Sequence, residues 1–206
     1  AASDVYKRQD EVYEHIVYAP NKHIYMQALD GMRERTIVCN SLSKTYSITG
    51  WRLGYVIANP EIIDRVKKVH DFLTVGAAAP LMEAATVGLK FDDKYYDELA
   101  AHYAHMKEVF VGGLKKLGLK YTDPQGAYYV LVDVSEFGVK DDVKFCEWMA
   151  QFVGVAAVPG SSFFREDVHN LVRFHFAKQD DTLNEAIKRL ATLKEKAMNA
   201  KNVDWR

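Results

Sequence analysis

The chain has 206 residues, of which 49% are hydrophobic and 12% are aromatic. This length and apolar content are sufficient for one large core or two small ones, and they exclude a disordered chain. Lysine and arginine (27 residues) nearly balance aspartate and glutamate (28 residues), which leaves a formal net charge of -1. Without a basic block or stripe, we expect no nucleic-acid partner, and we expect a small ligand instead.

Cysteine usage and hydropathy indicate the compartment. Cys39 and Cys146 lie far apart in apolar stretches, without a CxxC pattern or a His/Cys cluster, which favours a reduced, cytoplasmic setting. The sequence has no apolar run of 18 residues that predicts a membrane span, and its opening "AASDVYKRQ" lacks the apolar middle of a signal peptide. The first methionine is Met26, and no cap or turn marks the start as a domain edge. We therefore expect a fragment of a longer protein.

The first half of the chain alternates strand and helix patterns. Residues 10–18, "DEVYEHIVY", mix helix and strand signals, whereas the β-branched run at 35–41 and the run at 51–58 each predict a strand. A polar turn joins these two strands, and loops at strand ends carry the chemistry of α/β folds. Pro60 opens a predicted helix over 60–73, and the Ala- and Met-rich stretch at 77–89 predicts another.

The second half begins where the composition changes between residues 88 and 93, from small and apolar to charged and aromatic. We place a domain boundary near Phe91 and predict one long amphipathic helix over 92–118, ended by Gly118. The elements predicted after it are a strand at 127–134, a helix at 141–153, strands at 155–158 and 170–177, and a terminal helix from Thr182. This order predicts a small α+β or α/β unit.

The polar turn lies within residues 40–55, "NSLSKTYSITGWRLGY". An uncharged lysine amine, such as Lys44 would provide, condenses with a carbonyl to form a Schiff base when burial or a nearby cation lowers its pKa. Arg52 is suited to gripping a phosphate with two hydrogen bonds, and Ser41 adds a hydroxyl. The Thr49–Gly50 turn lets the backbone approach an anion closely. Together these residues predict a site for an aldehyde that carries a phosphate.

The sequence also permits other interpretations. A lone lysine in a polar loop is usually solvated. Ser41 and Lys44 also fit S-x-x-K, the acyl-enzyme motif of penicillin-binding enzymes, but the companion S-D-N and K-T-G motifs are missing. His102 and His105 have the spacing of a metal-binding pair, but no third ligand is evident, which favours a solvated helix face. The sequence therefore predicts no metal site.

The stretch "SLSKTYSITGWRLGYVIANP" closely resembles the pyridoxal-phosphate lysine region of class I/II aminotransferases, which belong to the fold-type I superfamily. "DEVYEHIVY" resembles the family segment in which an aspartate, here Asp10, pairs with the pyridine nitrogen and a tyrosine, here Tyr13, donates to the 3′ oxygen. "GVAAVPGSSFF" and "LVRFHFA" resemble the small-domain signatures, where Arg173 holds the substrate α-carboxylate. The resemblance gives Lys44 as the catalytic and cofactor-bound lysine, with Ser41 and Arg52 as the phosphate ligands.

The resemblance implies an α/β fold: part of the fold-type I large domain over residues 1–92, followed by a small α+β C-terminal domain over residues 93–206. It implies transfer of an amino group between an amino acid and a 2-oxo acid, with pyridoxal 5′-phosphate as cofactor and a homodimer as the full-length protein. Ahead of Asp10, the family's glycine-rich loop, ring-stacking aromatic and asparagine are absent, and "AASDVYKRQ" does not resemble its apolar strand. We therefore expect a truncated chain that is inactive and poorly stable alone.

Two other functions are also compatible with the sequence. The same fold resembles the effector domains of transcription regulators that sense pyridoxal phosphate, and pyridoxal-phosphate-dependent lyases share the lysine motif. Local alternatives also remain. Asp10 can serve as an acidic residue at a helix N-terminus. Tyr13 can be a core tyrosine, although it shares a face with Asp10 if the segment is helical.

The strand predicted at 170–177 places Arg173 on the face opposite its apolar residues, because side chains alternate along a strand. Arg173 and His175 then point away from the side that carries Val172 and Phe174. The arginine fork matches a carboxylate better than lysine does. The alternative is an exposed strand charge.

Overall fold

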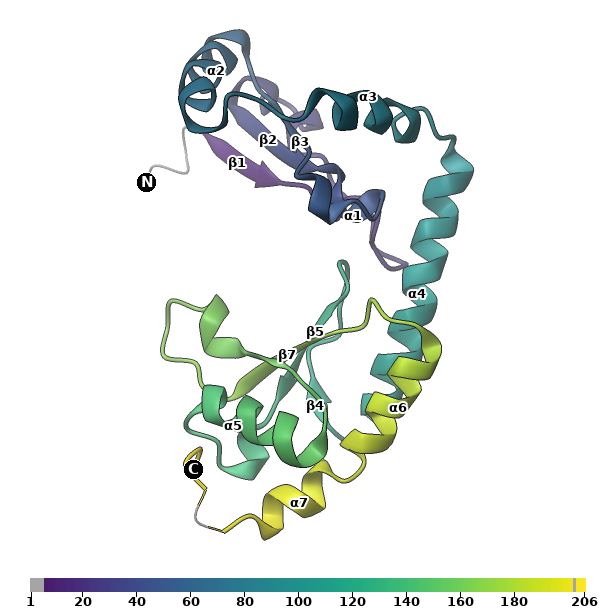
Figure 1. The fold of residues 1–206 in the computed structure, drawn as a ribbon, viewed down its shortest axis with the longest axis vertical. Coiled ribbons are helices and arrows are strands. Elements are labelled where there is room, and N and C mark those ends of the chain that lie inside the picture. Colours follow the sequence, from purple (N-terminus) through teal and green to yellow (C-terminus); the bar gives the residue numbers. More distant parts are fainter. Residues whose placement is uncertain (1–5, 202) are drawn as a thin grey trace. The chain divides into compact units, whose positions relative to one another are not determined.

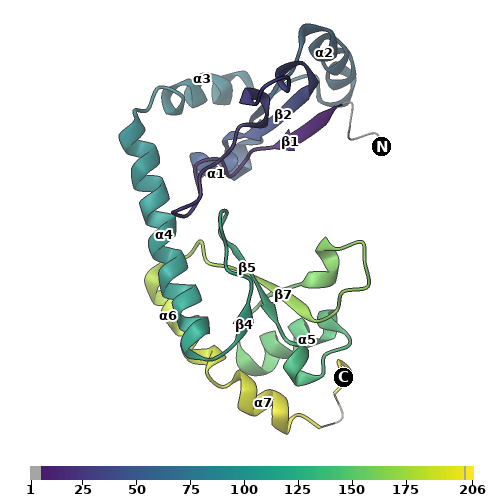
Figure 2. The same cartoon turned by 180° about the vertical axis from the view of Figure 1, so that it is seen from behind.

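The computed structural model describes residues 6–201 and 203–206 (Figures 1 and 2). They form two compact units, of which the first reaches to Ala100 and the second runs from Ala101 to Arg206. The division between these units falls inside helix α4 (Asp93–Lys116). Because α4 is continuous, its first turns belong with the first unit and its remainder belongs with the second.

The first unit contains a three-stranded sheet in the order β1 (Lys7–Asp10), β2 (Thr36–Ser41) and β3 (Gly54–Ile57). Strands β1 and β2 are parallel, with Asp10 beside Cys39. Strands β2 and β3 are antiparallel, with Ser41 beside Gly54. A Cβ atom on Gly54 would lie 2.5 Å from the Asn40 carbonyl oxygen, so this close register requires glycine.

Strand β1 begins within the opening stretch "AASDVYKRQ", where the sequence predicts no apolar strand. Its sequence, "KRQD", is polar and has no apolar alternation, yet it pairs with β2 along its whole length. The strand depends on a partner 29 positions later in the chain, Thr36 beside Lys7. Residues 10–18 are likewise not a helix, because Asp10 ends β1 and a turn follows it. Asp10 and Tyr13 therefore do not share a helical face.

The helices of the first unit follow strands β2 and β3 along the chain (Figure 1). The short α1 (Leu42–Thr45) continues directly from β2. Helix α2 (Pro60–Thr74) has proline in its first turn, and the Asn59 side chain accepts a hydrogen bond from the Ile62 amide as its cap. Helix α3 (Ala79–Gly88) follows it. The predicted helices at 60–73 and 77–89 are therefore present.

The second unit has an antiparallel sheet in the order β4-β5-β7-β6. Its strands are β4 (Lys120–Tyr121), β5 (Tyr129–Asp133), β6 (Val158–Pro159) and β7 (Leu171–His175). Strands β5 and β7 correspond to the two longer predicted strands. The strand predicted over 155–158 is present only at its end, where Val158 lies beside Arg173.

Helices complete the second unit. Helix α5 (Asp142–Trp148) continues as a π-helix (Met149–Val153), and α6 (Asp180–Leu190) and α7 (Leu193–Asn199) follow β7. Both views show α6 beside the later turns of α4 (Figures 1 and 2). A Cβ on Gly113 would meet the Ile187 side chain at 2.5 Å, so a glycine lets these helices approach. Short 3₁₀ turns occur at Met26–Ala28, Arg33–Arg35, Thr49–Trp51, Ser135–Phe137 and Gly160–Phe163.

The core of the second unit lies on one face of its sheet. Val130 stands opposite Phe174 across the β5–β7 pair, and both are buried. From α4, the Phe110 ring packs 5.8 Å from the Phe174 ring. The opposite face of β7 carries the half-buried Arg173, as the alternation predicts. Among the residues that the structure describes, no helix is both long and apolar enough to cross a membrane.

Candidate functional site

The predicted site residues of the first unit gather at one edge of its sheet. Asp10 ends β1 and Ser41 ends the parallel strand β2, so both stand at carboxyl ends. Lys44 follows in α1, and Arg52 lies two residues before the start of antiparallel β3, whose Gly54 pairs with Ser41. The carboxyl edge of a parallel pair is where α/β sheets bind ligands. The topology therefore brings Asp10, Ser41, Lys44 and Arg52 to the same edge.

Two hydroxyls lie at the start of α1. Ser41 caps the helix, with its Oγ accepting from the Ser43 amide at 3.2 Å. The same Oγ lies 2.7 Å from Ser43 Oγ and 3.2 Å from the Leu53 carbonyl oxygen, so it has two alternative acceptors. Ser43 is buried. The capping role and the predicted ligand role of Ser41 use the same oxygen, because a hydroxyl offers one donor and two acceptor positions.

The lysine-bearing turn is anchored by residues far away in the sequence. Tyr95, from the first turn of α4, donates its hydroxyl to the Thr45 carbonyl oxygen at 2.7 Å. The Tyr46 and Tyr96 hydroxyls lie 2.8 Å apart. Burial, together with the hydrogen bond to Tyr96, raises the pKa of Tyr46. These contacts hold the two residues that follow the half-buried Lys44, and the sequence motif alone gave no indication of them.

Arg52 has a backbone conformation that is uncommon for a residue with a side chain. Its φ and ψ are 57° and 45°, in the left-handed region. Its guanidinium Nη1 donates to the Thr49 carbonyl oxygen at 2.7 Å, and the residue is exposed. A guanidinium has five N–H donors, so this contact orients the group and leaves further donors for an anion.

Asp10 ends β1, and Tyr13 lies within the turn that follows it. Asp10 is exposed, and its Oδ1 accepts from the Val12 amide at 3.2 Å. Tyr13 is half-buried, and its carbonyl oxygen accepts from the Ile16 amide at 2.9 Å. The carboxylate is thus fixed by its own turn at the sheet edge, which is the local role expected of an acidic residue that precedes a turn.

Arg173 belongs to the second unit and lies between two aromatic rings. Its guanidinium carbon is 3.7 Å from the centre of the Phe163 ring and 4.1 Å from that of Tyr129. Stacking on aromatic faces holds the guanidinium plane and leaves its edge for a carboxylate. Tyr128, Tyr129, Arg173, His175 and Ala177 line a shallow pocket there. Burial, with a contribution from Lys178 and Arg173, lowers the pKa of His175.

A fully buried carboxylate supports the loop that carries Phe163. Asp142 Oδ2 accepts from the Ser161 amide at 2.8 Å, and its Oδ1 lies 3.0 Å from His169 Nδ1. The other ring nitrogen of His169 is 2.8 Å from Asp167 Oδ1. The Asp142 hydrogen bond, followed by the Asp167 hydrogen bond, raises the pKa of His169. Burial alone would raise the pKa of Asp142, but the bonds from Ser161 and His169 lower it.

The chain matches a known protein family over most of its length. Residues 6–190 match the family described as aminotransferase class I and II. The methionine aminotransferase of Escherichia coli (strain K12) is 36% identical over 194 residues, which cover 94% of this chain and 50% of that protein. The solved structure of N-succinyldiaminopimelate aminotransferase from Mycobacterium tuberculosis has a TM-score of 0.87 at 34% identity, covering 93% of this chain and 50% of that one.

A second solved structure, the aromatic aminotransferase from Pyrococcus horikoshii OT3, also has a TM-score of 0.87 at 34% identity, covering 95% of this chain and 53% of that one. The mixed α/β fold therefore matches about half of an aminotransferase fold. The chain belongs to the aminotransferase class I and II family. It spans about half the length of the curated relatives it matches.

Proposed function

We propose that the protein containing this chain is a pyridoxal-phosphate-dependent aminotransferase that moves an amino group between an amino acid and a 2-oxo acid. The observation that carries this proposal is the gathering of Asp10, Ser41, Lys44 and Arg52 at the carboxyl edge of one sheet. Family membership over residues 6–190 supports it. The large-domain part is proposed to extend to residue 92 and the small domain to cover residues 93–206.

The donor set at the sheet edge fits pyridoxal 5′-phosphate. Arg52 and Ser41 supply a guanidinium and a hydroxyl for the phosphate, and Lys44 supplies a primary amine for the aldehyde. Asp10 supplies a carboxylate for the pyridine nitrogen, and Tyr13 supplies a hydroxyl for the 3′ oxygen. When bound, this cofactor provides the electron sink that stabilises negative charge at the substrate α-carbon.

Each residue then has a defined task. Nζ of Lys44 accepts the proton from the substrate α-carbon and later returns one, and the Tyr95 and Tyr46 contacts hold its turn in place. Arg173 binds the substrate carboxylate through the edge of a guanidinium that Phe163 and Tyr129 hold between their rings. The carboxylate of Asp10 would keep the pyridine nitrogen of the bound cofactor protonated.

Two properties of the whole protein are part of the proposal. The homodimer is supported by exposed apolar side chains at the end of α2, where Phe72 is 91% and Val75 is 82% exposed. A cytoplasmic location is supported by the free thiols of Cys39 and Cys146. Burial raises the pKa of the Cys146 thiol to about 12, which makes it unreactive.

The test is an amino-transfer assay with pyridoxal phosphate, a panel of amino acids and a 2-oxo acid, in which the keto-acid product is measured. We expect Lys44→Ala to lower kcat/KM by at least about 10²-fold, the effect of losing a positioned acid–base group. Lys68→Ala, on the exposed α2, is the matched control and should leave the rate unchanged. Transfer by Lys44→Ala at the unaltered rate would refute the proposal. Binding of pyridoxal phosphate without amino-group transfer would favour the alternative function, the effector domain of a transcription regulator.

A further inference from the structure

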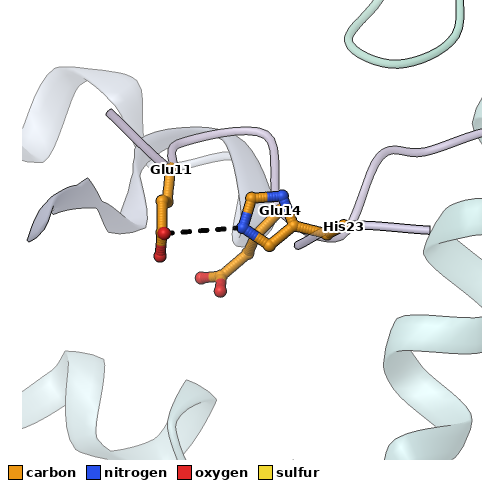
Figure 3. A group of neighbouring side chains, drawn as sticks. All are labelled: Glu11, Glu14 and His23. Atoms are coloured by element: carbon orange, nitrogen blue, oxygen red, sulfur yellow. Dashed lines mark ion pairs between the residues drawn. The ribbon is translucent and has the colours of Figure 1, made fainter. Parts of the chain in front are cut away.

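Three side chains of the first unit converge outside the proposed cofactor site. Glu11 and Glu14 lie in the turn after β1, and His23 lies in the loop beyond Pro20. One ligand atom from each lies within 4.8 Å of the other two, and among the described residues this is the group with that geometry. Figure 3 shows the Glu11 carboxylate pointing toward the His23 ring, with the Glu14 carboxylate beside both. Their separations in sequence match no familiar metal motif.

Glu11 is the unusual member, because it is a carboxylate that is only 3% exposed. Within the part of the chain that the structure describes, its Oε1 and the Nε2 of His23 are both buried and have no hydrogen-bond partner. These two atoms are 3.7 Å apart, which exceeds hydrogen-bond length. Buried carboxylates are normally hydrogen-bonded or bound to a cation. A cation between the two atoms would satisfy both.

Glu14 is held in place by a second set of side chains. Its Oε1 accepts from Asn40 Nδ2 at 2.5 Å, and the same Nδ2 lies 3.0 Å from the Tyr55 hydroxyl. Tyr25 packs edge-on against His23, with ring centres 4.6 Å apart. Hydrogen-bonded outer residues of this kind orient metal ligands.

We propose that Glu11, Glu14 and His23 bind a zinc ion, with water as the fourth ligand. An imidazole with two carboxylates is a donor set that zinc accepts, whereas calcium and magnesium prefer oxygen ligands alone. The ion would tie the turn between Glu11 and Glu14 to the loop at His23. Because this turn also carries Tyr13, the zinc site fixes the backbone beside the sheet edge. The inference stands independently of the proposed aminotransferase activity.

The experiment is a Co²⁺ titration of the chelator-treated 206-residue chain, followed by visible absorption, with Zn²⁺ added as competitor. We expect one Co²⁺ per chain with the absorption of a four-coordinate ion, and displacement by one equivalent of Zn²⁺. His23→Gln and Glu11→Gln should each lower the affinity by at least about 10-fold. His105→Gln is the matched control, because this exposed histidine also faces a carboxylate, that of Asp180 at 2.8 Å.

Loss of binding in His23→Gln with retention in His105→Gln would support the site. Circular dichroism of each metal-free variant separates a lost ligand from a lost fold. His23→Cys provides a second readout, since a cysteine ligand adds a thiolate-to-cobalt band in the near ultraviolet. A chain without a stoichiometric Co²⁺ site, or binding that is unchanged in both Glu11→Gln and His23→Gln, would overturn the proposal. So would retained binding by His23→Cys without the thiolate band.

Discussion

The two units differ in how they hold their predicted site residues. Among the described residues, the buried apolar side chains of the first unit number five, whereas those of the second unit number twenty-five. Helix α2 has no buried residue, and every residue of β3 is exposed. In the second unit, by contrast, Phe145, Phe176 and Trp205 are almost completely buried.

The two units therefore rely on different kinds of contact. In the first unit, the sheet edge that carries Ser41 and Lys44 is held by strand pairing, by the Ser41 cap and by tyrosine hydrogen bonds from α4. In the second unit, Arg173 is fixed by aromatic rings on a sheet whose other face is packed. Because apolar burial supplies most of the stability of a fold, we expect the second unit to be the more stable.

The largest expected effect is on the core of the second unit. Phe145 is fully buried, so Phe145→Ala should cost about 3–5 kcal/mol through lost burial and a cavity. Val87→Ala is the control in the first unit, where the side chain is 61% exposed on α3, and it should change stability by less than about 0.5 kcal/mol. Hydrogen exchange read by mass spectrometry measures the protection of backbone amides in each unit separately. Equal losses of protection in the two variants would contradict the comparison.

The next effect concerns the guanidinium of Arg173. Arg173→Lys keeps the charge but loses the planar fork and its stacking between Phe163 and Tyr129. We expect the KM for the amino-acid substrate to rise by about 10–100-fold, the loss of one charged hydrogen bond, with a smaller change in kcat. Arg165→Lys, at an exposed position nearby in sequence, is the control. An unchanged KM would remove Arg173 from the proposed carboxylate site.

A smaller effect on stability is expected at the β2–β3 pair, beside the turn that carries Lys44. Gly54→Ala places a Cβ 2.5 Å from the Asn40 carbonyl oxygen, and a backbone atom cannot move aside cheaply. We expect a loss of about 1–3 kcal/mol, typical of overpacking. Gly76→Ala meets no atom within 4 Å and should be close to neutral. Denaturant unfolding of both variants measures this difference, and a Gly54→Ala chain as stable as Gly76→Ala would show that the register is looser than described.

The smallest effect is the pH dependence of the second unit. His169 has a folded pKa raised above 6.5 by Asp142 and then Asp167, so its stabilising effect is full below pH 6.5 and is lost as pH rises through the folded value. The thermal midpoint should therefore fall modestly across that window. His169→Gln should flatten this slope, and His105→Gln should do so too, because the hydrogen bond to Asp180 raises the pKa of His105. A slope that persists in the double variant would exclude both histidines as its source.

The sequence predicted those parts that depend on local pattern. Strand β2 and helix α2 were found through β-branching, helical spacing and a proline at the helix start. Strand β1 was missed, because its polar residues form a strand only by pairing with β2. The segment after Asp10, where helix and strand signals are mixed, forms a turn, because Asp10 itself ends that strand.

The site divides in the same way. Ser41, Lys44 and Arg52 lie within one short motif and were identified from it, and their roles remain predictions. Tyr95 and Tyr96 contact the lysine turn from 50 positions away, which only tertiary structure reveals. The positions of Phe163 beside Arg173 and of Glu11 beside His23 likewise arise from folding, because neither pair has a spacing that a sequence pattern encodes.

The central claim is that the turn at the sheet edge holds a phosphorylated aldehyde through Lys44. The direct measurement is to mix the chain with pyridoxal phosphate, reduce it with borohydride and map the modified lysine by mass spectrometry, with Lys44→Ala alongside. We predict preferential modification of Lys44 and a corresponding loss in the variant. Modification scattered over exposed lysines such as Lys67 and Lys68, unchanged by Lys44→Ala, would contradict the claim.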